Sequence, residues 1–343
     1  MKIGSFDLKS DGVYIIAELS ANHGHDIEIA KESIKAAYEI GANAIKLQTY
    51  TPQSMTFDLD KDEFMANPSG PWAGKKLYDL YNESALPLEW HKELFNYARV
   101  IGIDIFSSPF DKEMVDFLEQ FHPSAYKIAS FEITDYELIR YTASKMKPII
   151  ISTGVATIGE IQDVVDICRE VGNEDIILLK CTSSYPAPLE EANLKTIPNL
   201  AETFGVVAGF SDHTLGITAP IVAVTLGAKV IEKHFILDKS IGGADADFSM
   251  DKIEFSLMVQ AIRDSEKLLG KIDYSMSEKK RKSRHAVRSL YVAKDIQKGE
   301  IFTEENICSI RPGYGAHPKY LKDILGKKAE KNYRYGERFS YLR

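Results

Sequence analysis

Two histidines, His213 and His234, are the residues of this chain that point most directly to chemistry. Each follows a short apolar run, Val206–Phe210 in one case and Val230–Lys233 in the other, that is typical of a buried parallel strand. Side chains just beyond the carboxyl ends of such strands lie where α/β proteins place their active sites. Taken singly, either residue is better explained as a satisfied core histidine. Together, with a carboxylate and water, they predict a divalent metal site that faces a small-molecule pocket.

Polar side chains also end the other apolar runs of the chain. Because side chains alternate along a strand, Lys46 and Gln48 share one face, as do Glu232 and His234, so both members of each pair can point inward. Lysines supply charge and hydroxyls supply oriented donors, which together suit an anion that carries both a phosphate and a carboxylate. The strand-end groups of this kind are Glu18, Lys46, Gln48, Ser107, Ser108, Lys127, Ser130, Glu132, Ser152, Thr153, Lys180, Thr182, Ser183 and Ser211.

Glu18 and the loop beyond His234 carry the remaining candidate acids. An acid in a buried strand must be paired, hydrated or functional, and a general base is one function that Glu18 could serve. Asp245 and Asp247 lie in a glycine-rich loop and are candidate sugar-binding or metal-shell carboxylates, although an ordinary turn explains the loop equally well.

The elements that must position these groups alternate regularly along the chain. Eight apolar runs are predicted as strands, and helical periodicity fills the stretches between them. Repeated strand-helix alternation over about 250 residues predicts a (β/α)8 TIM barrel. An open doubly wound sheet is the rival architecture, but the glycine-rich turn that usually follows its first strand is missing at 18–23. The predicted strands are Val13–Glu18, Ala44–Gln48, Asp104–Ser107, Ala125–Ala129, Pro148–Ser152, Ile176–Lys180, Val206–Phe210 and Val230–Lys233, and the clearest helices are Ile27–Ile40, Leu88–Ile101, Ile158–Val171, Ile217–Gly227 and Ile253–Leu269.

Three segments depart from this alternation. Thr49–Pro87 is far longer than an ordinary βα loop, which indicates a lid or a specificity element. Residues 270–287 carry the run Lys279–Lys282 and are predicted as a solvated linker. Residues 288–343 form a compact, turn-rich tail in which 294–302 and 331–339 share Lys, Gly-Glu and Phe in one register. We therefore expect a barrel domain at 1–269, the linker, and a small domain at 288–343.

Composition limits the classes of partner. The chain has 343 residues, a formal net charge of −8 and no basic footprint for nucleic acid. No run approaches the ~20 apolar residues of a membrane span, and the amino terminus lacks the apolar stretch of a signal peptide. Three cysteines without metal-ligand spacing make a disulfide framework improbable. We expect a cytoplasmic protein that binds neither nucleic acid nor membrane.

Several motifs, read together, resemble the sialic acid synthase family. The resemblance runs from the first strand to the carboxyl terminus, and the tail, with Arg288-Ser289-Leu290 and Ile310-Arg311-Pro312-Gly313, is similar to the antifreeze-like (SAF) domain, a small β-clip-like domain attached to these enzymes. Within the family, Leu19–His23 and the segment from Gly70 to Tyr81 look most like the pseudaminic acid synthases. The motifs that carry the resemblance are Ile16–His23, Ile45–Tyr50, Tyr126–Ser130, Ser152-Thr153-Gly154, Cys181–Pro186, Ser211–Thr214 and Glu232–Phe235.

The resemblance implies a transferase that condenses phosphoenolpyruvate with an open-chain N-acetylated amino sugar and releases phosphate. For a pseudaminic acid synthase the acceptor is 2,4-diacetamido-2,4,6-trideoxy-L-altrose. The resemblance also implies a divalent cofactor, Mn²⁺ or Mg²⁺, on His213 and His234, and a domain-swapped homodimer. N-acetylneuraminate and legionaminate synthases are the alternatives within the family, and a carbohydrate-binding barrel without turnover is the alternative outside it.

The resemblance assigns individual residues to the two substrates. It places Glu18 and Lys46 among the catalytic residues together with Lys127, His213 and His234. The phosphoenolpyruvate site comprises Lys46, Ser108, Lys127, Ser130, Ser152, Ser183 and Ser211, and the sugar site comprises Glu18, Tyr185, Asp245 and, from the tail of a second chain, Arg311. Ser183 departs from the asparagine that is usual in the family, and Ser108 from a frequent threonine.

Overall fold

The computed structural model describes residues 1–68 and 72–340, and it divides into two compact units, Met1–Gly270 and Lys271–Arg343. The first unit is a closed barrel of eight parallel strands in the order β10-β3-β4-β5-β6-β7-β8-β9. This confirms the predicted TIM barrel and excludes the open sheet. The strands are β3 Tyr14–Glu18, β4 Ala44–Thr49, β5 Asp104–Pro109, β6 Tyr126–Ile128, β7 Ile149–Ser152, β8 Ile176–Cys181, β9 Val207–Asp212 and β10 Val230–His234.

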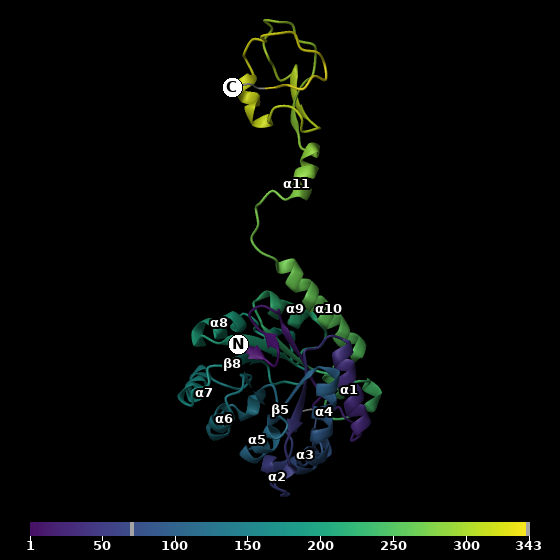
Figure 1. The fold of residues 1–343 in the computed structure, drawn as a ribbon, viewed down its shortest axis with the longest axis vertical. Coiled ribbons are helices and arrows are strands. Elements are labelled where there is room, and N and C mark those ends of the chain that lie inside the picture. The colour runs from purple at the N-terminus through teal and green to yellow at the C-terminus, as the bar shows by residue number, and fades with distance from the viewer. Residues whose placement is uncertain (69–71, 341–343) are drawn as a thin grey trace. The chain divides into compact units, whose positions relative to one another are not determined.

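Helices surround the strands (Figure 1). They are α1 Ile27–Glu39, α4 His91–Ile101, α5 Lys112–Glu119, α6 Tyr136–Ala143, α7 Ile158–Glu170, α8 Thr196–Phe204, α9 Thr218–Thr225 and α10 Lys252–Leu269. Capping hydrogen bonds from side chains fix where several of these helices begin. Before α7, for example, the Thr157 side chain accepts the Glu160 backbone N–H while the Glu160 carboxylate accepts the N–H of Thr157.

Two apolar clusters hold the barrel together. The larger lies between the strands and the helices, and the smaller fills the amino-terminal half of the barrel interior. A short hairpin, β1 Lys2–Ile3 paired with β2 Phe6–Asp7, contributes Ile3 to this inner cluster, together with Leu8. The sequence pattern did not predict this hairpin. It joins the apolar filling at the end of the barrel opposite the polar strand ends.

The long segment after β4 contains two helices, α2 Pro52–Met55 and α3 Leu77–Ser84. We call residues 50–87 the insertion. Gly70 and Pro71, which belong to one of the family motifs, lie outside the described residues. The Trp72 indole N–H donates to the carbonyl of Ala244 at 3.1 Å, so the insertion is tied to the loop that follows β10.

The second unit contains α11 Glu278–Ser283, strands β11 Ser289–Val292 and β12 Ile307–Ile310, and α12 Leu321–Ile324. Residues 267–288 are exposed. The linker at 270–287 stays a prediction. The predicted repeat is visible as two equivalent turns. Gly299 and Gly336 both have positive φ, and the carboxylates of Glu300 and Glu337 each accept the backbone N–H three residues earlier. None of the helices within the described part of the chain is long and apolar enough to cross a membrane.

Candidate active site

The inward-facing positions of the barrel change from apolar to polar toward the carboxyl ends of the strands. On β3 the order is Ile16 then Glu18, and on β10 it is Val230 then Glu232, with the apolar member of each pair in the inner cluster. The same change on the other strands builds a polar layer over an apolar floor. The members of this layer are buried although they are charged or hydroxylated, so each must find a partner or a ligand.

Two lysines and two glutamates form the centre of the polar layer. The Lys46 Nζ lies 2.5 Å from Glu18 Oε2 and 3.7 Å from Glu232 Oε1, and the Lys127 Nζ lies 4.0 Å from the same Glu232 oxygen. Glu232 therefore sits between the two ammonium groups. Its second oxygen, Oε2, is buried without a hydrogen-bond partner. An arrangement of two cations around an incompletely bonded carboxylate holds positive charge where an anion can enter.

Burial and charge shift the pKa values of these groups in opposite directions. Burial, together with the nearby Glu232 carboxylate, raises the pKa of Glu18 to about 7 despite the Lys46 ammonium. Burial also acts to raise the pKa of Glu232, but Lys127 and Lys46 outweigh it and hold that pKa below the ordinary value. Glu18 thus can carry or release a proton near neutral pH, whereas Glu232 stays ionised.

Three serines, Ser130, Ser152 and Ser183, line a small space beside Lys127. Its Nζ donates to Ser152 Oγ at 2.8 Å, and Ser130 Oγ is buried with no partner. A Cβ built on Gly154 would lie 2.3 Å from Ser183 Oγ and 2.6 Å from Ser130 Oγ, so these two hydroxyls face the same gap. We call this gap the serine cradle. On the other side of the layer, Ser108 Oγ lies 3.4 Å from Lys46 Nζ, and Ser211 Oγ donates to Glu232 at 3.3 Å.

The two predicted metal-binding histidines lie side by side, with ring centroids 5.5 Å apart. His213 Nδ1 lies 2.9 Å from the carbonyl of Thr182, which fixes the ring and leaves Nε2 as the acceptor nitrogen. His234 Nδ1 is buried without a hydrogen bond, 3.7 Å from Asp245 Oδ2. Burial lowers the pKa of His213 to about 4 and that of His234 to about 3, so both rings are neutral at pH 7. Neutral imidazoles are the form that binds metal ions.

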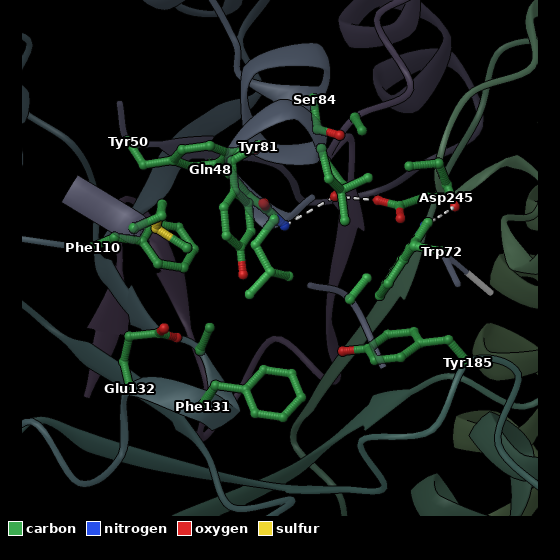
Figure 2. Close-up of a pocket in the computed structure, with 18 of the residues that line it drawn as sticks. Gln48, Tyr50, Trp72, Tyr81, Ser84, Phe110, Phe131, Glu132, Tyr185 and Asp245 are labelled. Carbon is green, nitrogen blue, oxygen red and sulfur yellow. Dashed lines mark hydrogen bonds between the residues drawn. The ribbon is translucent and has the colours of Figure 1, made fainter. Parts of the chain in front are cut away.

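A cavity of about 400 Å³ opens over the polar layer. One side carries Gln48 and Asp245, joined through the Ser20 hydroxyl, which accepts from Gln48 Nε2 at 2.9 Å and donates to Asp245 Oδ2. Figure 2 shows the opposite side, where the rings of Tyr50, Tyr81 and Phe110 face the cavity. Aromatic rings also line the side near the histidines, where the Tyr185 and His213 ring centroids are 4.3 Å apart and Trp72 lies near Asp245, whereas Glu132 lies on the side of Phe110 (Figure 2). The insertion supplies many of the lining residues: Tyr50, Met55, Ala66, Asn67, Trp72, Leu77, Leu80, Tyr81 and Ser84.

The structure brings together all the predicted site residues of the barrel at one mouth. Arg311 is not among them, because it belongs to the second unit, where it is exposed. Several residues of the site were assigned no role from the sequence, among them Ser20, Tyr81, Phe110, Glu232 and Gly154. Glu232 ended a strand but its place between the lysines was not foreseen, and Gly154 was noted only within a motif, although its missing side chain creates the serine cradle.

Comparison with known proteins identifies the family. The NeuB family matches residues 33–274, and the SAF domain matches 287–337. The chain belongs to the NeuB family. Pseudaminic acid synthase of Campylobacter jejuni (strain 81-176) is 51% identical over 98% of both chains. The N,N'-diacetyllegionaminic acid synthase of Legionella pneumophila is 38% identical over 93% of this chain and 91% of its own length. The structure of N-acetylneuraminic acid synthetase from Leptospira borgpetersenii, a complex with citrate, has 29% identity and a TM-score of 0.73 over 82% of this chain and 94% of its own.

Membership of the NeuB family agrees with the resemblance that the sequence motifs indicated. It agrees also with the order of the two units, since the SAF match falls wholly within Lys271–Arg343. The roles of individual side chains stay predictions, which the geometry above makes specific.

Proposed function

We propose that this NeuB family member is a pseudaminic acid synthase. It condenses phosphoenolpyruvate with 2,4-diacetamido-2,4,6-trideoxy-L-altrose and water, giving pseudaminic acid and inorganic phosphate. The observation that carries the proposal is the convergence of Lys46, Lys127 and the serine cradle beside two neutral imidazoles at one barrel mouth. The identity of 51% to a pseudaminic acid synthase, against 38% to a legionaminic acid synthase, supports the choice of acceptor.

Phosphoenolpyruvate fits the charge of the polar layer. Its phosphate needs hydrogen-bond donors and positive charge, which Lys127, Ser152 and the two cradle hydroxyls supply from β6, β7 and the loops beyond β6 and β8. Its carboxylate fits beside Lys46, close to Ser108. Glu232 stays ionised whereas Glu18 can take up a proton near neutral pH, so the two lysines are neutralised only in part and an entering anion completes the charge balance of a buried site.

The donor set fits a divalent cation, Mn²⁺ or Mg²⁺. His234 Nδ1 is a buried nitrogen without a partner, and His213 presents a second imidazole 5.5 Å away, between ring centroids. In residues 1–68 and 72–340 no group of three or more His, Cys, Asp or Glu side chains is placed to hold a metal. Water and the acceptor would therefore complete the coordination. The chemistry such an ion supplies is Lewis-acid polarisation of the acceptor's aldehyde oxygen.

The proposed reaction forms one carbon-carbon bond and breaks one carbon-oxygen bond. C3 of phosphoenolpyruvate attacks the aldehyde carbon, whose oxygen takes up a proton and becomes a hydroxyl. Water adds at C2 and loses a proton, and the resulting hemiketal phosphate collapses with release of phosphate through cleavage of its C2–O bond. Glu18, with a pKa of about 7 and a hydrogen bond from Gln48 at 2.9 Å, is placed to move one of these protons.

The acceptor lies in the cavity above the polar layer in this proposal. Its aldehyde end is near His234 and Asp245, and its far end meets the wall of Tyr50, Tyr81 and Phe110. A 6-deoxy sugar ends in a methyl group, and an aromatic wall favours a methyl group over a hydroxyl group that would lose its water. In this proposal the aromatic wall therefore favours a 6-deoxy acceptor over N-acetylmannosamine, and the insertion supplies two of its three rings.

We further propose that a domain-swapped homodimer completes the sugar site with Arg311 of a second chain. The barrel mouth carries apolar side chains that are half or more exposed on the loops after four consecutive strands, β6 to β9. A surface of this kind favours coverage by another protein surface. These side chains are Phe131, Val155, Ile158, Leu189 and Leu215. We place the enzyme in the cytoplasm, where its three free cysteines stay reduced.

Incubation of the full chain with phosphoenolpyruvate, the diacetamido altrose and Mn²⁺ tests the activity. We expect phosphate release that depends on the sugar, and ¹⁸O placed in the C2–O–P bridge of phosphoenolpyruvate should appear in the phosphate. Release no greater than in the control without sugar contradicts the proposal. Faster turnover of N-acetylmannosamine or of the legionaminic acid precursor reassigns the acceptor, and ligand-dependent stabilisation without product favours a binding protein.

Mixing two inactive chains tests the swapped dimer. In a dimer of an Arg311→Ala chain with a His234→Ala chain, one site has both defects and the other has neither. Random mixing should therefore restore about a quarter of the wild-type activity if the arginine acts across the dimer. No restoration, or a monomeric mass for the fully active enzyme, excludes this arrangement.

A further inference from the structure

A buried ion pair lies directly behind the two histidines, on the outer face of the barrel wall. Lys233 stands between Glu232 and His234 on β10, and Asp212 stands between Ser211 and His213 on β9. The strand register pairs Lys233 with Asp212, whose Oδ2 lies 2.5 Å from the lysine Nζ. Both residues are about 1% exposed. Because side chains alternate along strands, this pair points away from the polar layer to which its neighbours belong.

The pair also fixes the backbone next to His213. The Lys233 ammonium donates to the carbonyl of Thr214 at 2.5 Å, and Asp212 Oδ1 accepts the Thr214 N–H at 2.8 Å. Both backbone polar groups of the residue after His213 are therefore held by the ion pair. The carbonyl of His213 itself accepts the N–H of Ala187 at 2.9 Å. The turn that carries His213 is thus held by Lys233, the residue directly before His234.

Stability alone does not account for this arrangement. Two buried charges lose several kcal/mol of hydration each, and apolar side chains of similar size often stabilise a fold as well as such a pair does. What apolar side chains cannot do is bind the N–H and the carbonyl of one residue and so set its position. The hydrogen bonds of the pair go to each other and to the Thr214 backbone, so the pair holds the backbone of β9 and β10 beside the site. Its two charges also act on the imidazoles through space, since Asp212 acts to raise the pKa of His213 and Lys233 acts to lower that of His234.

We infer that the Asp212–Lys233 ion pair is a positioning device that sets the separation of His213 and His234 for one divalent cation. The inference rests on the proposed function, because it assigns the imidazoles to a metal ion. Neither residue contacts the cation or a substrate. Loss of the pair should weaken metal binding by letting the Thr214 backbone and the adjoining ring move, while the phosphoenolpyruvate groups on β4, β6 and β7 keep their places.

Direct binding of Mn²⁺ to the full chain, followed by the loss of the free-ion electron paramagnetic resonance signal, tests the inference without reference to turnover. We expect Lys233→Met and Asp212→Asn to raise the Kd for Mn²⁺ at least tenfold, to raise the Mn²⁺ concentration for half-maximal activity in parallel, and to change the KM for phosphoenolpyruvate less than threefold. Lys147→Met is the matched control. It removes the ammonium that lies 2.6 Å from Glu119, in a pair that involves neither β9 nor β10, and should leave Mn²⁺ binding unchanged.

A double variant separates positioning from stability. Asp212→Leu/Lys233→Met removes both charges and keeps apolar volume, so it should fold even where a single variant is unstable. Weak Mn²⁺ binding by the folded double variant supports positioning. Wild-type affinity in that variant, with only the unfolding temperature changed in the single ones, overturns the inference. A wild-type chain that binds no Mn²⁺ instead refutes the metal part of the proposed function.

Discussion

The absence of a side chain at Gly154 gives a sharp test of the phosphoenolpyruvate site. The residue lies between β7 and α7, and it is not among the residues with positive φ, so alanine can adopt its backbone conformation. The added Cβ would stand 2.3 Å from Ser183 Oγ and 2.6 Å from Ser130 Oγ. To reach ordinary contact near ~3.5 Å, each hydroxyl must move by roughly 1 Å, which two serine side chains can do by rotation.

The expected loss of affinity for phosphoenolpyruvate follows from the hydrogen bonds that are broken when the two serine hydroxyls rotate away. A hydrogen bond to a charged group contributes about 1.5–3 kcal/mol, so losing both hydroxyls from a bound phosphate costs roughly 3 kcal/mol or more. Since each 1.4 kcal/mol is tenfold in affinity, Gly154→Ala should raise the KM for phosphoenolpyruvate roughly 100-fold. The KM for the acceptor should change little, because Gly154 does not line the cavity.

Steady-state kinetics with each substrate varied in turn measures the KM for phosphoenolpyruvate and the KM for the acceptor separately, and thermal unfolding measures the stability of the variant. Gly159→Ala is the control, because nothing lies within 4 Å of a Cβ at that position in α7. It should keep the kinetics of the wild type, with stability equal to or slightly above that of the wild type because Gly159 lies in the first turn of α7. An unchanged KM for phosphoenolpyruvate in Gly154→Ala refutes the serine cradle as the anion site. An equal rise of this KM in Gly159→Ala would show that the effect comes from changes in helix α7 and not from the serine cradle.

Three further perturbations test other parts of the structure. Lys127→Met, which removes the ammonium that donates to Ser152, should raise the KM for phosphoenolpyruvate about 100-fold, and an unchanged value excludes a phosphate contact. His234→Ala should abolish turnover and Mn²⁺ binding while the unfolding temperature stays within a few degrees, and retained activity in metal-free buffer contradicts the role of this ring. Burial lowers the pKa of His91 in the folded chain to about 4 from 6.5, so the unfolded chain takes up the proton first as the pH falls. Stability should therefore drop by about 2 kcal/mol between pH 7 and pH 5 through this residue, and urea unfolding of His91→Gln should lack that part of the drop.

The barrel was predictable because its strands are buried on both faces. Runs such as Ile149–Ser152 leave no polar alternation, and they recur with helical stretches between them. The groups of the site were predictable for the same reason, since a lysine such as Lys46 interrupts an apolar run near the carboxyl end of its strand. The hairpin of β1 and β2 could not be predicted, because two-residue strands carry no periodicity.

What the sequence could not provide is the distance between groups on different strands. Glu232 was visible as a strand-end acid, but only the closed barrel shows that it lies between two ammonium groups. The serine cradle depends on loops after three strands meeting at Gly154. The pairing of Asp212 with Lys233 depends on the register between β9 and β10, and the residue pattern within each strand does not reveal that register.

The apolar floor beneath the polar layer is filled by Ile16, Ile150 and Val230 and is joined by the amino-terminal hairpin through Ile3, so it closes the barrel interior on the side away from the cavity. In the proposed reaction both substrates then enter, and both products leave, on the side of the cavity that the insertion lines. Since the nine-carbon acid is larger than either substrate, we expect substitutions at insertion residues such as Trp72 to change the rate of product release as well as the KM for the sugar.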